Sequence, residues 1–175
     1  SDPAAPADPA EAQADPMLDG GTPDDLLRAR VEMAAQLGPV TEDALTGSFG
    51  DDTLTGGAGR DALFGNEGND SLSGEAAADE IYGDEGDDTL AGGNGNDFLS
   101  GGDGNDALDG GDGGDRLFGG DGDDALAGGS GDDLLQGGFG ADTLSGGAGN
   151  DTLDGNVGPD GATGPRDTDA GDALD

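Results

Sequence analysis

A period of nine residues runs through most of this sequence and restricts the folds open to it. Twelve frames in the pattern G-G-x-G-x-D-x-L-x cover residues 47–154 without an insertion or a deletion. Position 1 is glycine and position 6 is aspartate in all twelve frames, and position 8 is leucine in eleven frames and Ile81 in the other. Self-similarity at a short fixed period is the signature of a stacked repeat architecture. The sequence therefore predicts a solenoid whose turns are built from these frames.

Composition indicates what such a solenoid can bind. The chain has 41 acidic residues and 5 arginines, for a net charge of −36, and it has no lysine, histidine, cysteine or tryptophan. Nucleic acid and anionic membrane surfaces are excluded as partners, because both require clustered basic residues. Zinc, copper and iron–sulfur sites need histidine or cysteine, whereas carboxylates and carbonyls suit a hard cation such as Ca²⁺ or Mg²⁺. Composition alone favours an acidic disordered chain, and only the order of the residues indicates a fold.

Each frame resembles the RTX, or haemolysin-type calcium-binding, nonapeptide G-G-x-G-x-D-x-U-x, where U is a large apolar residue. The resemblance covers residues 47–154, about three-fifths of the chain. It implies an all-β fold, a right-handed parallel β-roll (a β-solenoid) with two nonapeptide repeats per turn and Ca²⁺ between stacked turns. It also implies export by the type I secretion machinery of a Gram-negative bacterium, and therefore a secreted, extracellular protein.

The spacing within a frame suits this fold. Positions 7 to 9 are expected to form a short strand and the other six residues a turn. Side chains alternate along a strand, so position 8 points inward while positions 7 and 9, which are mostly small or polar, point outward. Glycine in the turn tolerates positive φ and leaves carbonyl oxygens free to face a cation. One leucine per frame makes a thin core and stacked aspartates repel each other, so folding is expected to depend on the bound metal.

The predicted carboxylate ligands are the position-6 aspartates of the twelve frames and of one loop after them. They are Asp52, Asp61, Asp70, Asp79, Asp88, Asp97, Asp106, Asp115, Asp124, Asp133, Asp142, Asp151 and Asp160. The resemblance implies carbonyl ligands from positions 2 and 4 of one loop and from positions 1 and 3 of the loop eighteen residues later. Two central sites would then combine Gly93, Gly95 and Asp97 with Gly110, Asp112 and Asp115, and Gly102, Gly104 and Asp106 with Gly119, Asp121 and Asp124.

Thirteen such loops, stacked two apart, form eleven pairs. The frame Gly74–Tyr82 is predicted to be the weakest, because Glu75 and Ala77 replace the glycines of positions 2 and 4 and a Cβ at position 4 strains the turn. Losses at this frame and at the C-terminal end leave about nine or ten Ca²⁺ ions.

The flanking segments do not follow the repeat. Residues 1–21 are predicted to be a disordered acidic Pro/Ala linker. Residues 22–38 predict a short N-terminal capping helix, whose apolar stripe covers the first turn of the array or, as the less favoured alternative, makes a dimer contact. The roll is assigned to residues 39–163, and residues 164–175 to a break followed by the truncated start of a further repeat. No stretch of the chain approaches the length of a membrane span.

Other readings of the pattern fail. Collagen needs glycine at every third residue, and the nearest EF-hand window places Ala107 at a ligand position. Catalysis is not expected, because the chain lacks histidine, cysteine and lysine and the repeat explains the aspartates of the frames. Two functions remain open: a secreted calcium-binding or adhesive protein in its own right, and the calcium-folding module of a larger secreted toxin, protease, lipase or alginate epimerase. In either case the chain is expected to be a monomer, and Ca²⁺ is its expected ligand.

Overall fold

Every regular element in the described part of the chain is a β-strand. The computed structural model describes residues 42–155 and 173–174, so the linker and capping helix predicted before residue 39 lie outside the described residues. The strands are β1 (Ala44–Thr46), β2 (Thr53–Ala58), β3 (Ala62–Glu67), β4 (Ser71–Ala76), β5 (Glu80–Glu85), β6 (Thr89–Asn94), β7 (Phe98–Asp103), β8 (Ala107–Asp112), β9 (Arg116–Asp121), β10 (Ala125–Ser130), β11 (Leu134–Phe139), β12 (Thr143–Ala148), β13 (Thr152–Asp154) and β14 (Ala173–Leu174).

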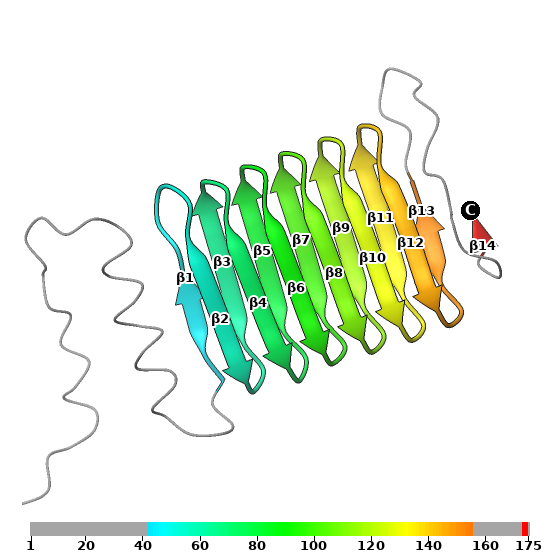
Figure 1. Cartoon of the computed structure of the whole chain (residues 1–175), viewed down its shortest axis with the longest axis horizontal. Helices are drawn as coiled ribbons and strands as arrows, with labels where there is room; N and C mark the ends of the chain where they lie inside the picture. Colours follow the sequence, from blue (N-terminus) through cyan, green and yellow to red (C-terminus); the bar gives the residue numbers. More distant parts are fainter. Residues whose placement is uncertain (1–41, 156–172, 175) are drawn as a thin grey trace, which may run out of the picture.

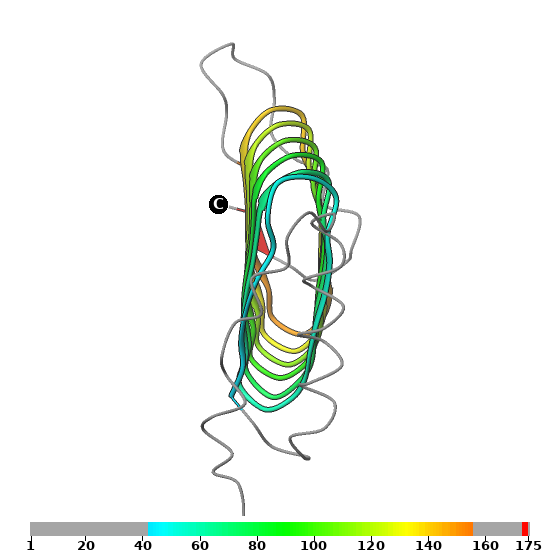
Figure 2. The same ribbon diagram turned by 90° about the vertical axis from the view of Figure 1, so that its left-hand side faces the viewer.

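The strands form two parallel sheets that face each other across a thin core. Sheet A has the order β1-β3-β5-β7-β9-β11-β13-β14, and sheet B has the order β12-β10-β8-β6-β4-β2. From β1 to β13, each strand pairs with the strand two places along the chain, eighteen residues away, as in the register Leu63↔Ile81. Figure 1 shows the strands stacked side by side along the molecule, and the view along the stack in Figure 2 shows the turns superposed as one flattened oval. The fold is thus an all-β parallel solenoid of about six turns with two frames in each turn.

The core is a single stack of position-8 side chains, as the alternation of residues predicts. These side chains are at most 6% exposed: Leu45, Leu54, Leu63, Leu72, Ile81, Leu90, Leu99, Leu108, Leu117, Leu126, Leu135, Leu144 and Leu153. Leu45 belongs to a degenerate frame before residue 47, and β1 still pairs in register with β3. The solenoid therefore begins one strand earlier than the twelve full frames.

Strands β2 to β12 are six residues long where the frame pattern predicts three. The ladder continues past positions 7 to 9 into positions 2 and 3, as in the pairs Gly102↔Gly120 and Asp103↔Asp121 of β7 and β9. Positive φ at position 2, for example 122° at Gly102, lets the backbone bend there while neighbouring turns stay paired. Only positions 4 to 6 are left outside the sheets, so the loop that carries the position-6 aspartate is a compact three-residue corner.

At the far end, β14 adds a strand to sheet A. Leu174 pairs in register with Leu153, twenty-one residues earlier. This spacing is three residues longer than the eighteen of the other turns, such as Leu135↔Leu153. The described residues contain no helix that is long and apolar enough to cross a membrane.

Candidate metal centre

The three-residue corners form two stacks, one along each edge of the solenoid. Loop stack 1, which precedes the strands of sheet B, consists of residues 50–52, 68–70, 86–88, 104–106, 122–124 and 140–142. Loop stack 2, which precedes the strands of sheet A, consists of residues 59–61, 77–79, 95–97, 113–115, 131–133 and 149–151. Each corner ends in the position-6 aspartate. The fold therefore brings the predicted carboxylate ligands together in two columns, six in each.

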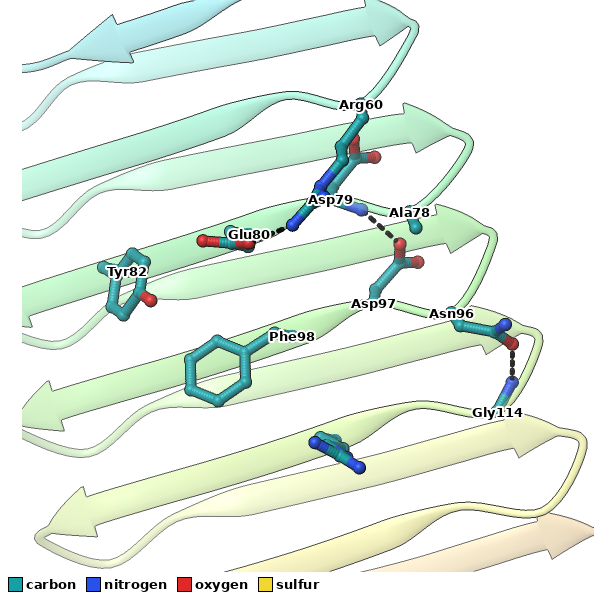
Figure 3. A pocket seen from close by; sticks show the side chains of 10 residues that line it. Arg60, Ala78, Asp79, Glu80, Tyr82, Asn96, Asp97, Phe98 and Gly114 are labelled. Carbon is teal, nitrogen blue, oxygen red and sulfur yellow. Dashed lines mark hydrogen bonds and ion pairs between the residues drawn. The ribbon is translucent and has the colours of Figure 1, made fainter. Parts of the chain in front are cut away.

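All twelve position-6 aspartates from Asp52 to Asp151 are buried, with at most 7% of their surface exposed. In the eleven aspartates from Asp61 to Asp151, one carboxylate oxygen, Oδ1, accepts a hydrogen bond from the backbone N–H of the equivalent aspartate one turn earlier. The Asp97 N–H donates to Asp115 at 2.8 Å and the Asp106 N–H donates to Asp124 at 2.8 Å. Figure 3 shows the same bond between the Asp79 N–H and Asp97. Each side chain therefore occupies the gap between its own corner and the preceding corner of its stack.

The second carboxylate oxygen has no such partner. In eleven of these aspartates, from Asp61 to Asp151, Oδ2 is buried and accepts no hydrogen bond. It lies against the position-1 glycine of its own frame, where a Cβ on Gly92 would come within 2.5 Å of the Asp97 Oδ2. The invariant glycine at position 1 is thus explained by the space that the carboxylate needs. Burying a charged oxygen without a partner costs folding free energy. A cation bound between the corners would offset this cost.

The predicted carbonyl ligands face the same gaps. A Cβ added to Gly111 or Gly113 would collide with the carbonyl oxygen of Gly93 or Gly95, respectively. The Gly110 oxygen lies on the other side of that gap, 2.7 Å from a Cβ built on Gly92.

The second central site repeats this arrangement. The oxygens of Gly102 and Gly104 face Gly120 and Gly122, and the Gly119 oxygen faces Gly101. The two remaining predicted carbonyls are already engaged, because Asp112 and Asp121 accept hydrogen bonds from the N–H groups of Gly95 and Gly104 at 2.7 and 2.8 Å. Six of the eight predicted carbonyl oxygens are thus directed at the facing turn, and the other two accept backbone hydrogen bonds from it. Asp160 lies outside the described residues.

This donor set fits Ca²⁺. No three carboxylates converge on one point within residues 42–155 and 173–174, so any ion in a gap must take most of its ligands from the backbone. Ca²⁺ accepts about six to eight oxygens of mixed origin in irregular geometry, whereas Mg²⁺ requires near-ideal octahedral geometry and retains water. Backbone carbonyls together with unpartnered aspartate oxygens match the first requirement.

Comparison with known protein families points the same way. The RTX calcium-binding nonapeptide repeat matches four times, over residues 41–72, 64–99, 100–135 and 128–161. The chain belongs to this family. The matches together span residues 41–161 of the 175 in the chain, which includes every frame and both loop stacks. The RTX repeat is a structural calcium-binding module, in agreement with the donor set of the loops. Comparison with curated proteins gives no significant match.

Burial changes the acidity of the RTX aspartates. Desolvation raises the pKa of six of them from the ordinary value of 3.8 to about 6, although the backbone N–H bond partly opposes the shift; they are Asp79, Asp88, Asp106, Asp115, Asp124 and Asp133. Neighbouring aspartates of the same stack add a smaller repulsive contribution, as Asp97 does at Asp79. The metal-free roll therefore binds protons more tightly than the unfolded chain does.

Acid is expected to promote folding of the metal-free roll. Because the folded-state pKa of these six aspartates is about 6 and the ordinary value is 3.8, their contribution to stability is complete below the lower value and is lost as the pH rises through the higher one. In EGTA, circular dichroism should show more β-structure at about pH 5 than at about pH 7.5. Sedimentation should accompany the measurement, because the isoelectric point is about 4.1. An unchanged or weaker β signal at the lower pH would contradict the burial of these carboxylates.

A second ladder, which the nonapeptide pattern does not predict, runs through position 5. On loop stack 1 the side-chain oxygens of Asp51, Asn69, Asp87, Asn105 and Asp123 each accept the backbone N–H of the next position 5, at 2.8–2.9 Å. On loop stack 2 the ladder is interrupted. Two of its bonds are present: the Gly114 N–H donates to the Asn96 side-chain oxygen, and the Asn150 N–H donates to the Asp132 side-chain oxygen. Asparagine or aspartate occupies position 5 in eight of the twelve frames. That frequency is the signal from which this ladder could have been predicted.

The frame Gly74–Tyr82 carries the strain that its sequence predicts. Glu75 has φ 78° and Ala77 has φ 87°, in the left-handed region that favours glycine. Two further non-glycine residues with positive φ, Asn66 and Asp84, occupy position 2 of the frames on either side. The stacked turns impose these angles, because positions 2 and 4 must bend whichever residue is present.

Replacing Ala77 by glycine should therefore stabilise the roll. We expect Ala77→Gly to raise the free energy of unfolding by about 1 kcal/mol, since glycine adopts this φ without a Cβ penalty. The matched control is Ala76→Gly one residue earlier, in β4, where φ is not positive; it should lower stability by about 0.5–1 kcal/mol. Urea unfolding in saturating Ca²⁺ measures both variants. Changes of the same sign would show that the backbone angle at residue 77 does not govern the effect.

Proposed function

We propose that the roll binds Ca²⁺ in the gaps between consecutive corners of each loop stack, and that this binding drives its folding. The observation that carries the proposal is the column of buried, unpartnered Oδ2 atoms from Asp61 to Asp151. Without a cation these oxygens are desolvated and uncompensated. With Ca²⁺ bound, they become ligands that tie each turn to the next, and the binding free energy contributes to folding.

Two central sites illustrate the proposed coordination. One lies between the corners 95–97 and 113–115, with carboxylate oxygens from Asp97 and Asp115 and carbonyl oxygens from Gly93, Gly95, Gly110 and Asp112. The other lies between 104–106 and 122–124, with Asp106 and Asp124 and with the carbonyls of Gly102, Gly104, Gly119 and Asp121. The hydrogen bonds that Asp112 and Asp121 already accept do not prevent coordination, because a carbonyl oxygen has a second lone pair.

The number of bound ions tests this proposal. The two loop stacks contain five gaps each within residues 42–155, and the predicted loop at Asp160 would add one more. We expect about nine or ten Ca²⁺ per chain, because the strained frame and the C-terminal end each weaken a gap. Ten ions would reduce the net charge from −36 to about −16, which still favours solubility.

Calcium content measured by atomic emission after gel filtration, together with calorimetric titration, gives this number directly. A content of one or two ions per chain would contradict binding in the repeated gaps.

The biological role proposed for the chain follows from its family. RTX proteins are typically secreted, so we propose export by type I secretion from a Gram-negative bacterium and folding in the calcium-rich medium outside the cell. Within that role, the roll acts as a secreted calcium-binding or adhesive protein in its own right. The alternative is that it is the calcium-folding module of a larger toxin, protease, lipase or alginate epimerase. The two differ in what accompanies the roll in the parent gene, so the length of that gene distinguishes them.

A further inference from the structure

The outer faces of the two sheets differ in chemistry. At positions 7 and 9, the outer face of sheet B carries serine, threonine, alanine and one aspartate, Asp109. The outward positions of sheet A carry Phe64, Tyr82, Phe98 and Phe118, which the sequence pattern did not single out. All four side chains are half-buried, and a contiguous group of partly exposed aromatic side chains on an outer sheet face is a candidate interaction surface.

The four aromatic side chains form one continuous row across β3, β5, β7 and β9. Phe64 and Tyr82 stack with ring centroids 5.2 Å apart and an interplanar angle of 2°. Tyr82 contacts Phe98 at 5.5 Å, and Phe98 contacts Phe118 at 5.3 Å. The row changes column at β7, because Phe98 stands at position 7 while the other three rings stand at position 9. Ser100 is the residue at position 9 of β7.

The positive charge of the described residues is concentrated at the same place. Arg60 and Arg116 are the two arginines within residues 42–155, and both line a groove of about 670 Å³ beside the aromatic row. Figure 3 shows Tyr82 and Phe98 in this groove, with Arg60 paired to Glu80. Elsewhere the described part of the chain carries acidic and neutral side chains, so this face is the exception in a strongly negative molecule.

On this face, the residues of β5 and β9 are arranged symmetrically about β7. Among the position-7 residues of sheet A, Phe98 lies between Glu80 on β5 and Arg116 on β9, each one strand away and in register. In the position-9 column, Ser100 lies between Tyr82 and Phe118 in the same way. Opposite charges and matching rings therefore lie at equal distances from the central strand.

We propose that this face binds the same face of a second copy of the chain. The twofold axis lies between the facing A sheets of the two copies, parallel to the strands and over β7. Rotation about it places Phe98 opposite Phe98 of the second copy, and it places Glu80 opposite Arg116 twice. It also places Tyr82 opposite Phe118 twice. An isologous contact requires self-complementarity of this kind, in which residue i meets j and j meets i.

The neighbouring loops extend the match. In the position-5 column centred on Asn96, Arg60 lies two turns before the centre and Asp132 two turns after it. The same rotation therefore places these opposite charges against each other. Ala78 and Gly114, one turn from the centre, are small and line the groove, which leaves room for the long side chains of Glu80 and Arg116 from both copies.

The size of the face sets the strength of the dimer. The proposed contact face spans the five strands β3, β5, β7, β9 and β11. Five strands spaced about 4.8 Å apart, each six residues long at about 3.3 Å per residue, give a face area of roughly 500 Å² per copy. About 1,000 Å² in total is at the lower end for a specific interface, and the net charge of each copy opposes association. We therefore expect a dissociation constant of about 10–100 μM at about 0.15 M salt, where charges beyond about 8 Å are screened.

Sedimentation equilibrium of the full chain in saturating Ca²⁺ tests the dimer. Circular dichroism of the same samples establishes that the roll is folded, so a failure of calcium-coupled folding is seen separately. The mass should rise with concentration from 16.8 kDa toward twice that value. Tyr82 is the single tyrosine of a chain without tryptophan, so quenching of its fluorescence by acrylamide should decrease over the same concentration range. A monomer mass at every concentration would overturn the proposal.

Charge reversal tests the geometry. Glu80→Arg and Arg116→Glu should each weaken self-association by about ten-fold or more, because like charges then face each other twice. A mixture of the two variants should associate at least as well as the unmodified chain. In that mixed dimer the new arginine at position 80 faces the new glutamate at position 116, and the native pair is kept at the second contact.

The matched control is Asp109→Arg on the outer face of sheet B, which changes the net charge by the same amount as Glu80→Arg. It should not weaken association, and by reducing net repulsion it can only strengthen it. If Asp109→Arg weakened association as much as Glu80→Arg does, or if mixing the two single variants restored nothing, the face of sheet A would not be the interface.

Discussion

Removal of calcium with EGTA at neutral pH is expected to leave the chain largely unfolded, and millimolar Ca²⁺ is expected to restore the β-roll. The core supplies one leucine or isoleucine for every nine residues, which is little apolar burial for a chain with 40 glycines to order. Buried aspartates stacked one turn apart oppose folding further while they are charged. Far-UV circular dichroism measured in EGTA and in Ca²⁺ follows the transition.

Two controls separate specific binding from charge screening. Sodium chloride at matched ionic strength should not induce the roll, because it screens charge without supplying a divalent cation that the loop oxygens can coordinate. Mg²⁺ should act poorly, because it requires octahedral geometry and dehydrates reluctantly. A spectrum in EGTA identical to that in Ca²⁺ would refute calcium-coupled folding. If sodium chloride induced the same β signal as Ca²⁺, charge screening alone would explain the folding.

Asp106→Ala is expected to damage the roll far more than Asp52→Ala, although both residues belong to loop stack 1. Asp106 lies between two complete corners: its Oδ1 accepts the Asp88 N–H at 2.8 Å, and its own N–H donates to Asp124. Its Oδ2 is unpartnered, whereas the Asp52 Oδ2 accepts the Ser48 N–H at 2.6 Å. Eighteen residues before Asp52 the sequence has no repeat frame. Asp106→Ala should therefore remove about two ions and Asp52→Ala about one at most.

Loss of the Asp106 side chain also leaves the buried Asp88 N–H without an acceptor, at a cost of about 1–3 kcal/mol. Asp106→Asn separates the two contributions, since the amide oxygen can still accept this hydrogen bond while the charge is lost. Because each turn contacts only its neighbours, a break at residue 106 should split the unfolding transition into two parts. Calorimetric calcium titration and thermal unfolding compare the three variants. Equal losses from Asp52→Ala and Asp106→Ala would refute the stacked-corner arrangement.

The local part of this structure could be predicted from the sequence, because the same nine residues meet the same constraints in every frame. Position 8 alternates with outward neighbours, so its burial follows from strand geometry. The strain at Ala77 was likewise predictable, since a Cβ at position 4 is penalised in any turn of this shape. Position 6 follows from its unbroken aspartate, although the sequence does not say that the side chain reaches back to the N–H of the preceding turn.

The stacking of frames eighteen residues apart was expected from the family resemblance, but only the tertiary structure showed which contacts the stacked turns make. The continuation of the strands through positions 2 and 3 depends on hydrogen bonds to the neighbouring turn, which no single frame contains. The same holds for the position-5 ladder and for the row from Phe64 to Phe118, because positions 7 and 9 vary freely within a frame and acquire meaning only when the strands are in register. Burial and turn chemistry are properties of one frame, so the sequence by itself determined them; the two faces and the contacts between turns arise from stacking, so the fold determined those.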